Sequence, residues 1–184
     1  MVERRERTRR LVHFAFGFCA LLVPWLGPVG SIAIAGAACL YNLVWAPAVG
    51  WDRAYRRTGE ARFSGIGTYP LAVLLLLLTT PPHVAMAAWG VLAAADPAAA
   101  TAGTRFPRPS IPWNRRESLV GTAAAVVVGA AAAAALLAYA GQPSWRGAVA
   151  AGVMGAIAES LPWPIDDNLP VACAAAVAVW TFGG

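Results

Sequence analysis

The stretch "LPWPIDDNLP", residues 161–170, places two adjacent aspartates and an asparagine among prolines, between long apolar runs. Glu159 stands just before it. Carboxylate and amide oxygens suit Mg²⁺, which keeps some water and usually shares its shell with substrate phosphates. We therefore take Asp166 and Asp167 as candidate metal ligands. Asn168 is expected to orient them and is a candidate substrate-binding residue. A solvated acidic turn is the competing interpretation.

A further carboxylate, Asp96, lies inside the apolar stretch "LAAADPAAATAG". It precedes Arg105 by nine residues, so it is expected roughly 13 Å from the end of its helix. An ionisable group within a membrane span is costly and by default functional, and Pro97 loosens the backbone hydrogen bonds around it. A carboxylate at this depth needs a metal, a cation or a water-filled cleft. A buried ion pair is the alternative.

The segment "TRFPRPSIPWNRRESLVGT" combines basic residues with a helix start. Arginine offers paired donors that match phosphate oxygens. Ser118 is predicted to cap the next helix, and a helix N-terminus attracts anions. Arg115 and Arg116 therefore become candidate phosphate ligands, although topology and ordinary capping also explain the pattern.

His13 follows Arg9 by four residues and Arg10 by three, which places the three residues on one face of a helix. This face is predicted to hold a phosphate, with His13 positioning a phosphate or a hydroxyl. The alternative is a helix terminus that anchors to lipid headgroups. Taken together, carboxylates and arginines at one membrane surface indicate phosphoryl transfer, which needs charge neutralisation and a base for the attacking hydroxyl.

The elements that must position these groups are predicted to be membrane helices. Of 184 residues, 59% are hydrophobic and 12% are charged, whereas soluble domains carry about 25% charged residues. We expect an all-α polytopic bundle forming a single domain over 1–184, because only helices satisfy their own backbone groups in lipid when no barrel is formed. The predicted spans number seven: 11–26, 29–47, 66–80, 83–103, 118–140, 146–161 and 169–183.

The arginines predict the orientation of the bundle. Every basic residue is an arginine, and all but Arg146 fall at 1–10 or in connections that share one side of a seven-helix bundle. The positive-inside rule then places the basic N-terminus 1–10 in the cytoplasm, together with the loop 159–170. This explains the net charge of +5 through topology and anionic headgroups, so we expect no nucleic-acid partner.

Four short motifs, in order, are similar to those of a known family. They are "RRLVH" from Arg9, "DPAAATAG" from Asp96, "RRESLVG" from Arg115, and Glu159 followed by "DDNLP". The chain resembles the integral-membrane CTP-dependent lipid kinases, which include dolichol kinase, phytol kinase and yeast-type diacylglycerol kinase, and whose bacterial members are often labelled phosphatidate cytidylyltransferase-like. Val120 stands where the family commonly has Glu, with Glu117 three residues away, and Ala95 replaces a Gly.

The resemblance implies transfer of the γ-phosphate of CTP to the hydroxyl of a membrane lipid alcohol, such as a polyprenol, phytol or diacylglycerol, with Mg²⁺ or Ca²⁺. Asp167 and Asp166 would organise the metal and the triphosphate, and Asp96 or Glu159 would be a second metal ligand or the base. The expected substrate-binding residues are Arg9, Arg10, Arg115, Arg116, Ser118, Gly121 and Asn168.

Two other functions stay open at this point. A phosphatidate cytidylyltransferase would make CDP-lipid and release pyrophosphate instead of CDP, but the Asp-rich C-terminal signature expected of it is not apparent. A small transporter or scaffold would use Asp96 and Glu159 as an ion path, but the two halves show no convincing repeat. For any of the three we expect an integral protein of a prokaryotic plasma membrane, with its site facing the cytoplasm.

Overall fold

The computed structural model is helical along nearly all of its described length, with no β-strand beyond an isolated bridge among these residues. It describes residues 2–50, 65, 67–107, 109–164 and 166–183, and the side chains of Thr8 and of Arg10 onward within them. The elements are α1 Val2–Gly17, η1 Phe18–Leu22, α2 Val23–Leu40, η2 Tyr41–Trp45, α3 Ala46–Ala48, α4 Thr68–Thr79, α5 Pro82–Arg105, α6 Leu119–Tyr139, α7 Trp145–Ser160 and α8 Asn168–Phe182.

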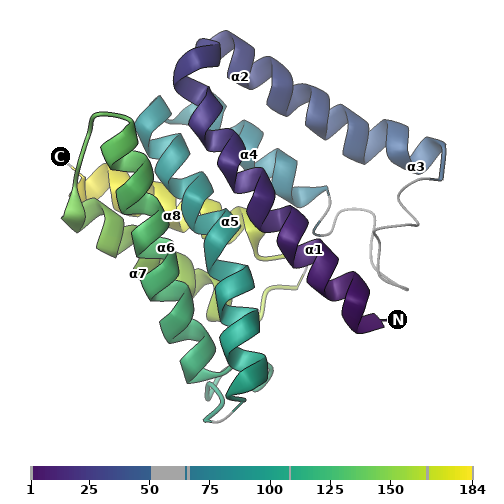
Figure 1. The fold of residues 1–184 in the computed structure, drawn as a ribbon, viewed down its shortest axis with the longest axis vertical. Coiled ribbons are helices and arrows are strands. Elements are labelled where there is room, and N and C mark those ends of the chain that lie inside the picture. The colour runs from purple at the N-terminus through teal and green to yellow at the C-terminus, as the bar shows by residue number, and fades with distance from the viewer. Residues whose placement is uncertain (1, 51–64, 66, 108, 165, 184) are drawn as a thin grey trace.

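A sharp turn separates the first two predicted segments. Gly27 adopts φ 65°, a left-handed conformation that favours glycine, and Pro28 follows it. The helical path is broken there, and α2 runs off in a new direction from α1 (Figure 1). The predicted connection at 27–29 is therefore confirmed, and α1 packs on α5 whereas α2 packs mainly on α4.

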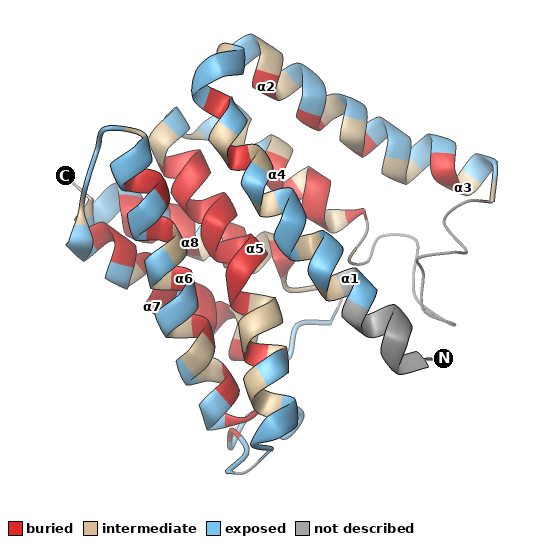
Figure 2. Ribbon diagram, in the orientation of Figure 1, coloured by how far each residue is buried: buried red, intermediate tan, exposed pale blue. Residues whose placement is uncertain are grey.

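The core of the bundle is α5. Its side chains from Val84 to Ala95 are all buried (Figure 2). Helices α1, α4, α6, α7 and α8 all contact it. Most of these buried residues are alanine, valine or glycine, and small side chains let helix backbones approach closely where lipid supplies no hydrophobic driving force between helices.

The contact between α6 and α7 brings backbone atoms of the two helices together. A methyl group added at Gly152 would lie 2.6 Å from both the amide nitrogen of Ala130 and the carbonyl oxygen of Val126. Both are backbone atoms, so no side-chain rotation relieves the clash. Gly36 of α2 differs, because nothing lies within 4 Å of the same added atom. A small residue is thus required for close helix packing at Gly152, whereas Gly36 faces open space.

Helix length and hydropathy support a membrane protein. Among the described residues, the stretches long and apolar enough to cross a bilayer are Arg10–Ala48, Pro82–Arg105 and Leu119–Tyr139. The first of these contains the break at Gly27. Helices α4 and α8 are shorter apolar helices. Every predicted segment coincides with helix, but seven spans and a cytoplasmic N-terminus stay predictions.

Replacing Gly152 by alanine is expected to destabilise the bundle by about 1–3 kcal/mol, as overpacking typically does. Gly36→Ala is the matched control, since it gains helix propensity at no steric cost and should be neutral or stabilising by up to ~1 kcal/mol. Thermal unfolding of both variants in detergent measures the difference. Equal midpoints would contradict the close approach of α6 and α7.

Candidate functional site

A hydrogen-bonded clamp joins the start of α8 to the start of α4. One oxygen of Asp166 accepts from the backbone N–H of Gly65 (2.6 Å), and the other accepts from the Thr68 hydroxyl (2.7 Å) and the Asn168 backbone N–H (3.0 Å). The Asn168 side-chain amide donates to the Thr68 hydroxyl (3.0 Å) and to the Gly65 carbonyl (3.4 Å). Asp166, Asn168, Gly65 and Thr68 form what we call the clamp.

The clamp separates the roles of the two adjacent aspartates. Three donors already occupy the carboxylate of Asp166. In the structure this residue therefore ties two helices together, whereas the sequence predicted it to be a metal ligand. Asn168 is buried, and its side-chain amide nitrogen donates within the same tie. The Asp167 carboxylate caps no backbone N–H of α8, and the negative charges that act on it include those of Asp96 and Glu117.

The connection between α5 and α6 folds into a compact turn. Ile111 is buried at its base, where its N–H donates to the Glu117 carbonyl (3.0 Å). Asn114 donates from its side chain to the Ser160 carbonyl (3.2 Å), at the last residue of α7. The turn is therefore fastened to the end of α7 beside Glu159. Arg115 and Arg116 lie exposed in this turn, immediately before Glu117.

Ser118 caps α6 as predicted, because its hydroxyl accepts from the Gly121 N–H (3.0 Å). Both residues are buried at the contact between α5 and α6. A methyl group at Gly121 would lie 2.9 Å from the Ala99 carbonyl oxygen, and one at Gly103 would lie 3.1 Å from the Ser118 hydroxyl. The contacts that the structure gives Ser118 and Gly121 are thus internal, and binding of substrate by either stays a prediction.

Four carboxylates from separate segments form the carboxylate cluster: Asp96 of α5, Glu117 of the turn, Glu159 of α7 and Asp167 before α8. The negative charges of Asp96, Asp167 and Glu117 all act on Glu159. One Glu159 oxygen is buried and has no hydrogen-bond partner. The structure therefore brings together Asp96, Glu159 and Asp167, which the sequence predicts to be functional, and adds a fourth carboxylate to them.

The environment of Asp167 and Glu117 opposes their ionisation. Burial, together with the smaller effects of the charges of Asp96 and Asp166, raises the pKa of Asp167 to about 7. Burial also raises the pKa of Glu117, with the charge of Asp96 as the second cause. Several carboxylates that repel one another in a half-buried site favour binding of a cation, which would neutralise them.

Glu117 is the residue that the sequence motifs underrated. Val120, which the resemblance to lipid kinases aligns with a common Glu, is exposed on α6. Glu117 lies three residues earlier, before the helix, and interacts electrostatically with Asp96, Glu159 and Asp167. Its carboxylate therefore reaches the cluster although its place in the motif is offset.

The cluster fits a Mg²⁺ ion whose shell is completed by water and phosphate, and not one held by protein side chains alone. Among the described residues, no group of three His, Cys, Asp or Glu side chains is already arranged to hold a metal ion. Mg²⁺ does not need such a cage, since one or two carboxylates, water and substrate phosphates commonly complete its shell. The donor chemistry and the unpartnered Glu159 oxygen fit a cation that arrives with a polyphosphate.

His13 links α1 to two other helices. Its Nε2 donates to the Leu92 carbonyl of α5 (3.0 Å), and its ring lies edge-on against Tyr69 of α4, with centroids 4.3 Å apart. Leu92 precedes Asp96 by one helical turn, so the histidine contacts α5 one turn before a member of the cluster. Arg10 is half-buried.

Some predicted phosphate ligands lie outside the described part of the chain. The side chain of Arg9 is among these, so its place beside His13 stays a prediction. The arginines at 53–62, and Arg108, also lie outside the described residues.

Comparison with known proteins identifies no relative: no family model, no curated protein and no solved structure matches the chain. The four motifs are thus the basis of the resemblance to lipid kinases. The geometry of the clamp, the turn and the cluster is independent of that resemblance.

The raised pKa of Asp167 predicts how stability depends on pH. Between the ordinary value of 3.8 and about 7 the folded protein keeps a proton that the unfolded chain releases, so stability falls as pH rises through this window. In metal-free buffer the thermal midpoint of the protein should fall from about pH 5 to about pH 7.5, and that of Asp167→Asn should fall less. Parallel curves would contradict a buried, protonated Asp167.

Breaking the clamp should loosen α4 from α8. Asp166→Ala removes a charged acceptor shared by three donors, and hydrogen bonds to charged groups contribute about 1.5–3 kcal/mol each. Thr68→Val removes one of the same bonds, so the double variant should lose clearly less stability than the sum of the single losses. Thermal unfolding of the three variants tests this, and strict additivity would show that the two side chains are not partners.

Proposed function

We propose that this protein is a membrane-embedded kinase that transfers the terminal phosphate of a nucleotide, CTP by resemblance, to the hydroxyl of a membrane lipid alcohol at the cytoplasmic face. The observation that carries the proposal is the convergence of two opposite charge types. The exposed pair Arg115 and Arg116 lies on a turn that is fastened to the end of α7, and it directly precedes Glu117, whose negative charge acts on Glu159 and Asp167.

The arginines supply the contacts to phosphate. A polyphosphate placed against the carboxylate cluster alone would be repelled, whereas the guanidinium groups of Arg115 and Arg116 offer paired donors to its oxygens. Because Asn114 fixes the turn to Ser160, these donors are held near the place where charge develops during transfer. Fixed donors of this kind stabilise a transition state better than mobile ones.

The carboxylates of the cluster would have two roles, metal binding and proton transfer. Asp167, with Glu117 beside the arginines, would hold Mg²⁺ or Ca²⁺, whose charge when bound neutralises phosphate oxygens. Asp96 or Glu159, the members carried by helices, would accept the proton of the lipid hydroxyl as its oxygen forms a bond to the γ-phosphorus. The bond from that phosphorus to the bridging oxygen breaks, and the nucleoside diphosphate leaves. His13, which bonds the Leu92 carbonyl one turn before Asp96, would position the hydroxyl through its contacts with α5.

The proposal predicts a labelled lipid phosphate. Purified protein given γ-labelled CTP or ATP, Mg²⁺ and a panel of prenols, phytol and diacylglycerol should transfer label to at least one alcohol, and EDTA should abolish transfer. Asp167→Asn should lower the rate about 100-fold or more. Arg115→Gln should raise the nucleotide KM, whereas Arg146→Gln, in the first turn of α7 and at the end opposite Ser160, should change neither parameter.

The products exclude the alternatives. Release of pyrophosphate with phosphatidate as acceptor would instead show a cytidylyltransferase, and ion flux in proteoliposomes without nucleotide would show a transporter. Undiminished transfer by Asp167→Asn would remove that residue from the mechanism.

A further inference from the structure

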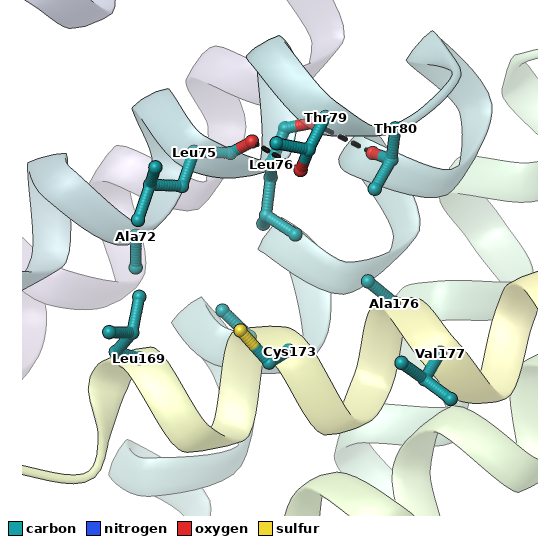
Figure 3. A pocket seen from close by; sticks show the side chains of 10 residues that line it. Ala72, Leu75, Leu76, Thr79, Thr80, Leu169, Cys173, Ala176 and Val177 are labelled. Carbon is teal, nitrogen blue, oxygen red and sulfur yellow. Dashed lines mark hydrogen bonds between the residues drawn. The ribbon is translucent and has the colours of Figure 1, made fainter.

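A groove of about 150 Å³ lies between α4 and α8 (Figure 3). Side chains from both helices line it along most of their lengths. They include Ala72, Leu75 and Thr79 from α4, and Leu169, Cys173 and Val177 from α8.

The lining of the groove is apolar in effect, although it contains two threonines and a cysteine. The Thr79 hydroxyl donates to the Leu75 carbonyl (2.6 Å), and the Thr80 hydroxyl donates to the Leu76 carbonyl (2.8 Å) (Figure 3). Each hydroxyl is therefore bonded within its own helix. Since a thiol behaves as a small hydrophobe, the groove suits a hydrocarbon chain and offers little to a polar group.

One end of the groove meets the site. Leu169 directly follows Asn168 of the clamp, and Ala72 lies one turn after Thr68. From there the lining continues for eight residues along each helix, to Thr80 and to Val177, which is about 12 Å. A chain lying in the groove would thus have one end beside the clamp, and so close to Asp167.

The negative charges near the groove favour an occupant whose head group is a neutral hydroxyl. The groove ends near Asp166 and Asp167, where the cluster already holds carboxylates that repel one another. The phosphate of a phospholipid would add a further negative charge there, whereas the hydroxyl of an alcohol is neutral and can donate a hydrogen bond to a carboxylate. A groove between just two helices also suits one chain better than a pair.

We propose that the groove between α4 and α8 binds the single hydrocarbon tail of the alcohol substrate and directs its hydroxyl to the carboxylate cluster. This inference rests on the proposed function and narrows its substrate class to single-tailed alcohols of the prenol type, in preference to diacylglycerol.

Photolabelling tests the binding site without catalysis. A farnesol analogue with a diazirine in its tail is irradiated with the protein in phosphatidylcholine nanodiscs, and the labelled peptides are mapped. Label should concentrate on α4 and α8 and should fall about tenfold or more with excess farnesol. Label that farnesol does not displace would identify a bilayer lipid in the groove and overturn the proposal. Label spread over α6 would also overturn it.

Filling the groove provides a second test. Cys173→Phe should abolish displaceable label on α4, and Val177→Phe at the groove's exposed edge gives a second variant in case the first fails to fold. Val127→Phe on α6 is the matched control, since Val127 and Val177 are 67% and 65% exposed, and it should leave the label unchanged.

Kinetics distinguish the two proposals. If the wild type transfers phosphate, the KM of Val177→Phe for farnesol should rise about tenfold or more, with the nucleotide KM unchanged. Normal KM values for both substrates would overturn the groove while leaving the kinase intact. Displaceable photolabel without any phosphate transfer would retain the groove and reject the kinase.

Discussion

The clamp around Asp166 is the interaction on which the site depends. A carboxylate that accepts three hydrogen bonds from Gly65, Thr68 and Asn168 ties the start of α4 to the start of α8. Because Asp166 faces α4, its neighbour Asp167 is left for the cluster. The same tie sets where α4 and α8 begin, and hence where the groove between them meets the charged groups. The hydrogen bonds of the clamp thus position both the carboxylate cluster and the apolar groove.

The free-energy cost of gathering carboxylates away from water is the second constraint on the site. Carboxylates gathered among membrane helices lose hydration and repel one another, which destabilises their charged forms. The protein tolerates this at Glu117 and Asp167, and Arg115 and Arg116 lie exposed on the same turn as Glu117. Among the described residues, the side-chain charges that act on Glu159 and Asp167 are all negative, which is the condition expected of a site that receives a cation from outside.

Much of the architecture could be predicted from the sequence, because hydropathy and helix signals are local. The helical segments, the turn at Gly27 and the Ser118 cap all follow from residues close to one another in the chain. The clamp could not be predicted in this way, since Gly65 and Asp166 are 101 residues apart and glycine gives no side-chain signal. Glu117 was difficult to predict for a related reason. The motif aligned Val120 with the common Glu, and only the shape of the turn brings the carboxylate of Glu117 to Asp96.

The contact between His13 and Leu92 has a consequence for biogenesis. The two residues are separated by 79 positions, and Tyr69, the other neighbour of the histidine, also follows much later in the chain. Since chains are made from the N-terminus, α1 is synthesised before α4 and α5 exist, when its histidine ring has not yet met these partners. Packing of α1 on its final neighbours therefore follows synthesis of α5, and such long-range contacts slow folding. Until then α1 lacks the contacts with Leu92 and Tyr69 that hold it in the folded bundle.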